Sequence, residues 1–297
     1  MEILKSARPH GSKAEQRFAR DWLDSIPNME SDSYGNRFLR IDGDGDSIVW
    51  ASHIDTVHRT GGKQKIRKRA DVIALAADSK SHCLGADDGA GVWLMLEMIT
   101  AGKPGLYIFH RAEEIGGLGS DFIASHRCDI LAGADAVVSL DRFGFDSVIT
   151  HQGGRTCSDS FARSLADGLG LGNLAPDDGG LFTDSANYVD VVGECTNLSV
   201  GYFGHHTAAE SLDVGFVCLL RDKLIALDSA ALTMERAAGD SQWDSLPIMD
   251  STDAPAYAFE YMRTRDDYES DSLDSWEREI ESRFHDMTAG DSVELKR

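Results

Sequence analysis

Residues 84–91 read LGADDGAG, and this short stretch decides the fold that the rest of the chain must support. Its glycines allow a tight turn of the backbone. The apolar run 92–99 that follows predicts a helix, so Asp87 and Asp88 lie at a helix start that we expect to be buried. Two adjacent buried carboxylates need a cation or several hydrogen-bond donors to offset their desolvation. An ordinary acidic helix N-terminus explains the pair equally well, because carboxylates are favourable there.

Strand-like and helix-like segments alternate on both sides of this stretch. Short apolar runs predict core strands, and longer amphipathic segments predict the helices between them. The predicted strands are 48–51, 106–109, 136–140 and 198–202, and the predicted helices are 14–26, 92–99, 119–126, 160–169 and 214–236. Residues 64–77 predict a hairpin, and Ser12 can cap the first helix. This order predicts an α/β fold with a mostly parallel, mixed sheet sandwiched by helices.

Polar residues fall where the predicted strands end, or in the turns that leave them. They are His53, Asp87, Glu113, Glu114, Asp141 and His206. In open α/β sheets, ligands bind at the carboxyl ends of strands, so we expect these side chains to converge on one edge of the sheet. Asp55 shares a face with His53, two residues before it, and can orient the imidazole ring.

Each of these motifs also has a structural explanation when it is taken alone. The His53–Asp55 pair is common in surface turns, and adjacent Glu113 and Glu114 are typical of an acidic helix start. The paired histidines at 205–206 are compatible with hydrogen-bonded loop residues. The order of the motifs along the chain is what indicates a single site.

The composition limits the partners and the compartment. Of 297 residues, 50 are acidic and 29 are basic, which gives a formal charge of −21. This charge repels nucleic-acid backbones and anionic membranes, so we expect neither as a partner. No run approaches the ~18 apolar residues of a membrane helix, and the N-terminal MEILKS lacks the apolar core of a secretory signal. We therefore expect a cytoplasmic protein. Five scattered cysteines predict small buried side chains rather than disulfides or a thiolate zinc site.

The ordered set of motifs resembles a known family. The set is His-x-Asp at 53–55, Gly-Ala-Asp-Asp at 85–88, Glu-Glu-Ile-Gly at 113–116, the strand-terminal Asp141, and His-Thr-x-x-Glu at 206–210. This order is similar to that of the co-catalytic zinc exopeptidases. They include peptidase T-like tripeptidases, zinc aminopeptidases, and carboxypeptidases and deacylases of the same catalytic fold. The resemblance covers roughly residues 45–235.

The resemblance implies a site with five ligands for two metal ions. His53 and Asp141 would hold one ion, Glu114 and His206 would hold the other, and Asp87 would bridge them. Nitrogen and oxygen ligands without thiolates suit two Zn²⁺ ions, with Co²⁺ or Mn²⁺ as substitutes. Three carboxylates leave two divalent ions with about one positive charge in excess, which a bound hydroxide neutralises.

The same resemblance assigns roles to residues around the metals. Glu113 would be the general base, which takes the proton of the attacking water and passes it to the leaving amine. Asp55 matches the partner of the first histidine. Residues 179–185 resemble a loop near the active site of relatives, where Asp184 could anchor a substrate ammonium group. His205, beside a ligand, could polarise the carbonyl or simply pack in its loop.

The spacing between the motifs leaves no room for an inserted domain. Many relatives insert a lid or dimerisation domain of about a hundred residues, whereas the widest gap here, from Asp141 to His206, is 65 residues. We predict one catalytic domain over residues 1–238. From 239 to 297, apolar periodicity weakens and acidic residues dominate. This composition predicts an acidic extension with a helix around 275–284, partly helical or disordered.

We therefore expect a metal-dependent hydrolase that acts on a small peptide or amide. An aminopeptidase or a di- or tripeptidase is the leading expectation. An amidohydrolase of N-acyl amino acids or another small amide would use the same residues, since specificity lies in the pocket loops. A catalytically silent binding protein on the same fold is the remaining alternative. The sequence leaves the oligomeric state open.

Overall fold

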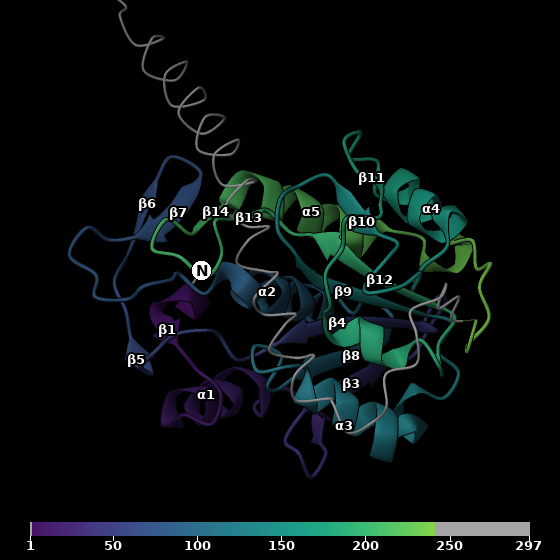
Figure 1. Ribbon diagram of the computed structural model, residues 1–297, viewed down its shortest axis with the longest axis horizontal. Helices are drawn as coiled ribbons and strands as arrows, with labels where there is room; N and C mark the ends of the chain where they lie inside the picture. The colour runs from purple at the N-terminus through teal and green to yellow at the C-terminus, as the bar shows by residue number, and fades with distance from the viewer. Residues whose placement is uncertain (1, 241–297) are drawn as a thin grey trace, which may run out of the picture. The chain divides into compact units, whose positions relative to one another are not determined.

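Eight strands form the central sheet, and in spatial order they are β11 (Ala175–Asp177), β10 (Ser147–Ile149), β12 (Glu194–Ser199), β9 (Ala136–Arg142), β4 (Ile48–His53), β8 (Gly105–His110), β3 (Arg37–Ile41) and β2 (Glu30–Ser31) (Figure 1). In the computed structural model, which describes residues 2–240, β4 pairs in parallel with β8 and β9, and β9 with β12. β3 runs antiparallel to β8, and β10 antiparallel to β12. The predicted mostly parallel, mixed sheet is confirmed.

Alternate residues of the central strands face two separate hydrophobic cores. On β4, Ile48 and Trp50 belong to one core, whereas Val49 and Ala51 belong to the other. All four side chains are buried, so both faces of the sheet are covered, as its near-continuous apolar strands indicate. The first face packs against α2 (Ala86–Thr100), α4 (Asp159–Leu169) and α5 (Val214–Ala226), and the second against α3 (Leu118–His126) and the short helix η4 (Asp184–Tyr188). Figure 1 shows α3 on the opposite side of the sheet from α2 and α5.

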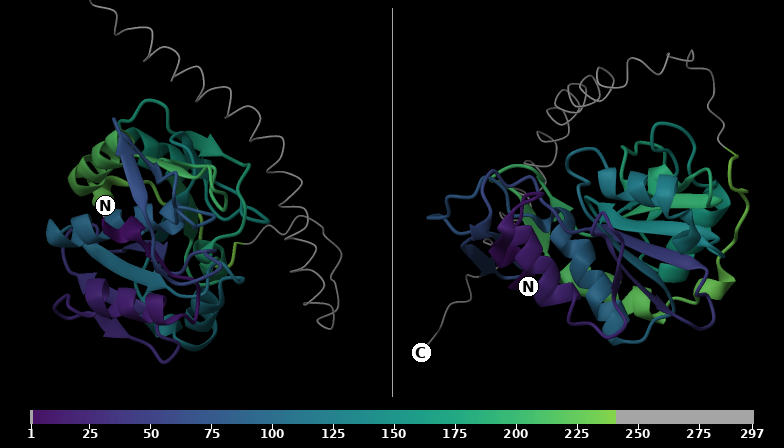
Figure 2. Two further views of the ribbon diagram at one scale, coloured as in Figure 1. Left: turned by 90° about the vertical axis from the view of Figure 1, so that its left-hand side faces the viewer. Right: turned by 90° about the horizontal axis from the view of Figure 1, so that it is seen from below.

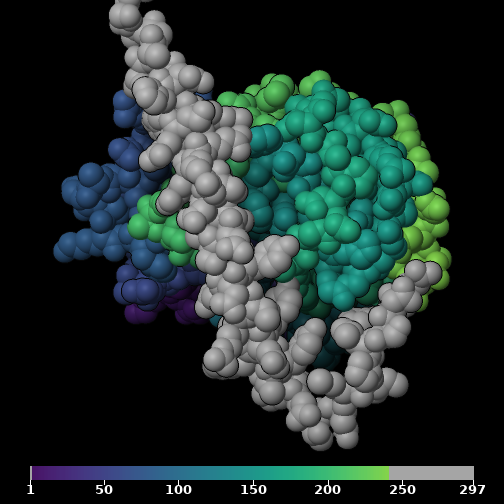
Figure 3. Space-filling view, turned by 45° about the horizontal axis from the view of Figure 1, so that its top comes forward, coloured from purple at the N-terminus to yellow at the C-terminus, as the bar shows by residue number. Residues whose placement is uncertain are grey.

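The predicted hairpin belongs to a second sheet. β6 (Ile66–Arg69) and β7 (Val72–Leu75) pair antiparallel, which confirms the hairpin. β7 also pairs with β14 (Ser211–Asp213), and β14 pairs with β13 (Tyr202–Phe203). This four-stranded sheet therefore connects the hairpin, blue in Figure 3, to the segment that carries His206.

Ser12 starts the first helix, as predicted. Its side-chain oxygen accepts a hydrogen bond from the Glu15 backbone N–H at 3.1 Å, which caps α1 (Lys13–Phe18). The helical backbone continues as a π-helix, η2 (Ala19–Leu23), and ends short of the predicted limit near 26. The elements that precede and flank it are η1 (Glu2–Lys5), β1 (Ser6–Ala7) and β1's antiparallel partner β5 (Gly62–Lys63). Figure 2 shows η1 and α1 in purple beside α2, and side chains of all three helices share one core.

The predicted strand 198–202 is wrong as a single element. β12 already begins at Glu194 and ends at Ser199, and β13 begins at Tyr202. Gly201 between them has a φ of +88°, a conformation that glycine adopts readily. The chain turns there from the central sheet into the second sheet.

The predicted helix 214–236 is too long, because α5 ends at Ala226. The chain beyond it is held by Glu194, a buried carboxylate on β12, whose Oε1 accepts hydrogen bonds from the backbone N–H groups of Glu235 and Arg236, both at 2.9 Å. The Arg236 guanidinium donates to the carbonyl oxygens of Thr156 and Gly193, both at 2.6 Å. These long-range bonds replace helical ones, and local periodicity carries no sign of them.

The chain between Asp141 and His206 builds strands and helices of the same two sheets and their covering layers, as expected without an inserted domain. Two short 3-10 helices, η3 (Cys128–Leu131) and η5 (Ser229–Ala231), connect other elements. The boundary at residue 238 stays a prediction. The predicted acidic extension and its helix around 275–284 lie outside the described residues, apart from residues 239 and 240.

Among residues 2–240, no helix has the length and apolar character needed to cross a membrane. All five cysteines are free thiols, and Cys83, Cys157 and Cys195 are buried as predicted. Cys128 is exposed and Cys218 is half-buried, so the prediction of buried side chains is wrong for these two.

Candidate metal centre

Six predicted site residues meet at the carboxyl edge of the central sheet. His53 ends β4, Asp141 lies near the end of β9, and Asp87 lies at the start of α2. Glu113 and Glu114 occupy the turn that follows β8, and His206 follows β13 with a φ of +63°. The parallel strands β4, β8 and β9 deliver His53, the glutamate pair and Asp141 to one place, as the rule for open α/β sheets predicts. The other two residues reach it from α2 and from the second sheet.

Asp87 lies at the centre of the group. Its Oδ1 is 3.0 Å from Nε2 of His53, and its Oδ2 is 3.1 Å from Nε2 of His206. On the first side, Asp141 Oδ1 is 3.5 Å from Nε2 of His53. On the second side, Glu114 Oε2 is 3.1 Å from Nε2 of His206. The side chains thus form two clusters that share Asp87.

Glu113 lies beside the first cluster, with its Oε2 3.8 Å from Nε2 of His53. Asp55 holds the turn that carries it: Oδ1 accepts a hydrogen bond from the Glu113 N–H at 3.2 Å, and Oδ2 accepts one from the Glu114 N–H at 3.3 Å. Oδ1 of Asp55 also lies 3.7 Å from Nδ1 of His53. One buried carboxylate therefore positions both the first histidine and the glutamate pair.

Glu210 and Asp88 stabilise the Gly-Ala-Asp-Asp turn. The sequence contained Glu210 in the last motif but gave it no role. Its carboxylate accepts hydrogen bonds from four successive backbone N–H groups, at 2.6–3.1 Å, those of Leu84, Gly85, Ala86 and Asp87. Asp88 accepts hydrogen bonds from the Ser52 hydroxyl, the His53 N–H and the Gly91 N–H. Because its oxygens are occupied, Asp88 anchors the turn, while Asp87 faces the centre.

Gly91 explains why the third glycine of this stretch is needed. A Cβ at this position would lie 2.1 Å from the Leu140 carbonyl oxygen and 2.6 Å from Asp88 Oδ1. No side chain fits, so α2 approaches the end of β9 closely only because residue 91 is glycine. This contact brings Asp87 near Asp141.

Three further residues orient Asp141, and of these only Thr183 lies in a segment that the sequence indicated near the site, the loop 179–185. The Thr183 hydroxyl donates to Oδ2 at 2.8 Å, and the Tyr202 hydroxyl donates to the Asp141 carbonyl oxygen at 2.8 Å. Asn197 Oδ1 accepts a hydrogen bond from the Asp141 N–H at 3.0 Å. All three come from other elements, and only the folded chain brings them to Asp141.

A buried arginine lies behind the carboxylates. Arg8 has no exposed surface, and its Nε donates to the carbonyl oxygen of Ile54 at 2.6 Å, between His53 and Asp55. Burial lowers the pKa of Arg8 to about 10, although Asp88, Asp55 and Glu210 raise it. The N-terminal segment thus supplies a fixed positive charge to the acidic cluster.

The close carboxylates and imidazoles shift one another's protonation. Burial raises the pKa of Glu113 well above its usual value, and burial together with Asp87 raises that of Asp141 to about 6. Burial lowers the pKa of His206, but Glu114 and Asp87 outweigh it and raise the value to about 11. These raised pKa values mean that the cluster holds protons more tightly than isolated side chains do, so a positive charge is favoured at its centre.

The donor set fits divalent metal ions. Ligand atoms of His53, Asp87 and Glu114 lie within 4.8 Å of one another, and so do those of His53, Asp88 and Asp141. Glu114 Oε1 is buried, with no hydrogen-bond partner among the described residues. An unsatisfied buried carboxylate oxygen is costly, and a cation would satisfy it. Imidazole and carboxylate ligands without thiolates suit zinc.

The two residues predicted to contact substrate lie at different depths. Asp184 is 2% exposed, with Ser120 Oγ donating to Oδ1 at 2.6 Å and His110 Nδ1 lying 3.1 Å from Oδ2. A substrate ammonium group would have to displace one of these partners, so this geometry does not favour the anchor role. The His205 ring is half-buried and stacks on Phe143 at 5.3 Å between centroids. Its role in polarising a carbonyl stays a prediction.

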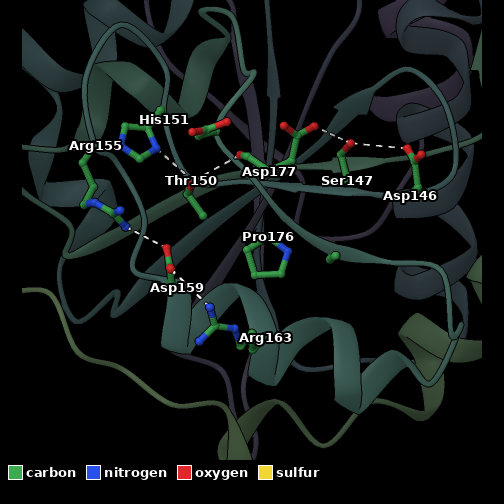
Figure 4. A pocket seen from close by; sticks show the side chains of 11 residues that line it. Asp146, Ser147, Thr150, His151, Arg155, Asp159, Arg163, Pro176 and Asp177 are labelled. Carbon is green, nitrogen blue, oxygen red and sulfur yellow. Dashed lines mark hydrogen bonds and ion pairs between the residues drawn. The ribbon is translucent and has the colours of Figure 1, made fainter.

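A separate groove of about 500 Å³ lies beside α4 and the β10–β11 edge (Figure 4). Both charge signs line it, with the Asp159 carboxylate 2.9 Å from Arg155 Nη1 and 3.3 Å from Arg163 Nη2. Its lining residues are other than the nine predicted site residues. The candidate active site is therefore the cluster of titratable side chains around Asp87, and this groove is separate from it.

Comparison with solved structures identifies the fold. The chain is similar to the aminopeptidase PepT of Bacillus cereus, with a TM-score of 0.60 and 16% identity over 78% of this chain and 96% of that one. A tripeptidase of Staphylococcus aureus gives a TM-score of 0.61 and 15% identity over 77% and 96%. The TET1 peptidase of Pyrococcus horikoshii gives 0.54 and 15% over 73% and 95%. No protein-family model and no curated protein matches the chain.

These comparisons confirm the predicted resemblance at the level of the fold. The chain folds as the catalytic domains of these peptidases do. At identities of 15–16%, the similarity establishes the fold alone. The chemistry of this chain depends on the residues of its own site.

We expect Glu210→Gln to weaken zinc binding by about 10–100-fold, as loss of a residue that orients ligands does in other metal sites. In the variant, the NH₂ group of the glutamine side chain faces backbone N–H groups that the Glu210 carboxylate accepts in the wild type. Two donors cannot bond to each other, so the turn that positions Asp87 becomes less stable. Competitive titration with a chelating dye measures the affinity. Glu194→Gln is the matched control, because Glu194 also accepts four hydrogen bonds but lies away from the centre. Unchanged zinc affinity in a folded Glu210→Gln protein would show that Glu210 does not position the site.

Proposed function

We propose that the protein is a metal-dependent exopeptidase, an aminopeptidase or a di- or tripeptidase, with two zinc ions in this centre. The position of Asp87 is the main support for this proposal, because its two oxygens each lie about 3 Å from a different histidine. His53 and Asp141 would hold one ion, Glu114 and His206 the other, and Asp87 both. The peptidase fold supports this assignment.

The metals and the protein divide the chemistry. Bound between these ligands, two divalent ions would lower the pKa of a water molecule and polarise the scissile carbonyl. Glu113 contributes the proton transfers: its carboxylate takes a proton from the attacking water and returns it to the leaving nitrogen. Asp55 keeps Glu113 in reach, because it holds the backbone N–H of Glu113 and lies beside His53.

The substrate would be a small peptide. An N-acyl amino acid or another small amide would meet the same catalytic residues, and a panel of substrates decides between them. The expected lack of nucleic-acid or membrane partners, and the cytoplasmic location, remain predictions from composition and from the N-terminal sequence.

Purified protein should contain about two equivalents of zinc or a similar divalent ion, and a chelator should abolish hydrolysis reversibly. His53→Ala and Asp87→Ala should lose metal and activity together, whereas His126→Ala, at an exposed histidine of α3, should keep both. Elemental analysis gives the metal content, and amino-acid anilides, dipeptides and N-acetylated amino acids test the activity. Full activity in a metal-free preparation would contradict the assignment. Turnover of the N-acetylated compounds alone would favour the amidohydrolase.

Substitutions of the two adjacent glutamates should differ in kind. Glu113→Gln keeps size and hydrogen bonding but cannot accept a proton, so it should retain metal and lose about 10²–10⁴-fold in turnover. Glu114→Gln removes a ligand, so it should weaken one metal, and added zinc or cobalt should restore part of its activity. Metal content and kcat of both variants are the measurements. Loss of metal in Glu113→Gln but not in Glu114→Gln would reverse the two roles.

A further inference from the structure

Large apolar side chains are exposed next to the candidate centre. In the described part of the chain, seven large hydrophobic residues are exposed. Three of them lie in the two segments that flank the centre: Ile115 is 48% exposed, Leu118 43% and Leu181 36%. Ile115 directly follows Glu114, and Leu181 is two residues before Thr183. This concentration is more than scattered surface exposure, and clustered apolar surface marks binding sites.

The two segments contact each other. A Cβ on Gly117 would lie 2.7 Å from Cζ of Phe182. The Phe182 ring therefore packs directly against the backbone at Gly117, in the space that a side chain would need. Asn187 Nδ2 donates to the Gly117 carbonyl oxygen at 3.2 Å. The contact of Phe182 with Gly117 therefore places the loop 179–183 against the turn 113–118, and Asn187 of η4 strengthens the attachment.

The loop 179–183 is fixed to the centre at both ends. The Thr183 hydroxyl donates to Asp141 Oδ2 at 2.8 Å, and Arg142 Nη2 donates to the Gly179 carbonyl oxygen at 3.1 Å. Asp141 and Arg142 are consecutive residues of β9. Since a residue spans at most about 3.6 Å, the Cα of Leu181 lies within ~7 Å of that of Thr183, which touches a proposed metal ligand.

We propose that Ile115, Leu118, Leu181 and Phe182 form an apolar wall that selects the side chain of the substrate residue whose carbonyl is attacked. The inference rests on the proposed function, and it names the substrate class: peptides whose residue at that position is large and aliphatic. Glu113 must reach the water that attacks this carbonyl carbon, and the adjacent Cα of the substrate carries the selected side chain. Burying a leucine side chain against such a wall is favourable, whereas a carboxylate would be desolvated beside an acidic cluster.

Aminoacyl hydroxamates test the wall without any need for turnover. They chelate the metal and present one amino-acid side chain, so calorimetric titration of the zinc-loaded protein reports on the pocket. Leucine hydroxamate should bind about 10–100-fold more tightly than alanine or aspartate hydroxamate. Ile115→Ser and Leu181→Ser should each reduce the leucine-to-alanine ratio by about 3–10-fold, with alanine hydroxamate unaffected. Leu219→Ser, at a leucine of α5 that is 46% exposed, is the matched control and should change nothing.

The outcomes separate the wall from the proposed function. Equal binding of the three hydroxamates, or a ratio that Ile115→Ser and Leu181→Ser leave unchanged, overturns the wall. Leu181→Lys gives an independent check, since the added ammonium group should raise the affinity for aspartate hydroxamate relative to leucine hydroxamate. Selective binding by a protein that hydrolyses no peptide would support the wall and overturn the proposed function alone.

Discussion

Mutual repulsion among buried carboxylates is the constraint on which the rest of this structure depends. Seven carboxylates gather at the carboxyl edge of the central sheet. Four of them are buried, Asp55, Asp87, Asp88 and Glu210, and three are half-buried, Glu113, Glu114 and Asp141. A carboxylate without a partner is expensive to bury, and like charges in one place raise one another's pKa. The surrounding elements are arranged so that most of these groups receive a partner from the chain itself.

The chain supplies those partners to the carboxylates that hold the backbone, and the carboxylates beside the two histidines are available to bind cations. Glu210 receives four backbone N–H groups, Asp55 receives two, and Arg8 places a buried positive charge near both. Asp87, Glu114 and Asp141 turn instead toward His53 and His206, and one oxygen of Glu114 has no hydrogen-bond partner among the described residues. This division between satisfied and unsatisfied carboxylates is the physical basis for the two-metal proposal.

Much of this arrangement could be predicted from the sequence. Apolar runs ending in polar residues predicted the parallel sheet and the edge where His53, Asp87 and Asp141 meet, because strand direction fixes where such residues emerge. Tyr202 and Arg8 could not be predicted, since each acts across a long separation in the chain and neither belongs to a recognisable motif. Thr183 lies in the loop 179–185 that the resemblance places near the active site, but its hydrogen bond to Asp141 could not be read from the sequence. The end of α5 was missed for the same reason: Glu194 binds the backbone at 235 and 236 from another element. The sequence indicated that Asp184 could anchor a substrate ammonium group, and only the fold shows it buried against His110 and Ser120.

Asp87 is proposed to join two metal sites, and diffraction from zinc-loaded crystals at the zinc absorption edge would locate both ions. We expect two anomalous peaks about 3.5–4 Å apart, one beside His53 and Asp141 and the other beside Glu114 and His206, with one oxygen of Asp87 near each. A single peak, or two peaks ligated by Asp88 in place of Asp87, would contradict this proposal.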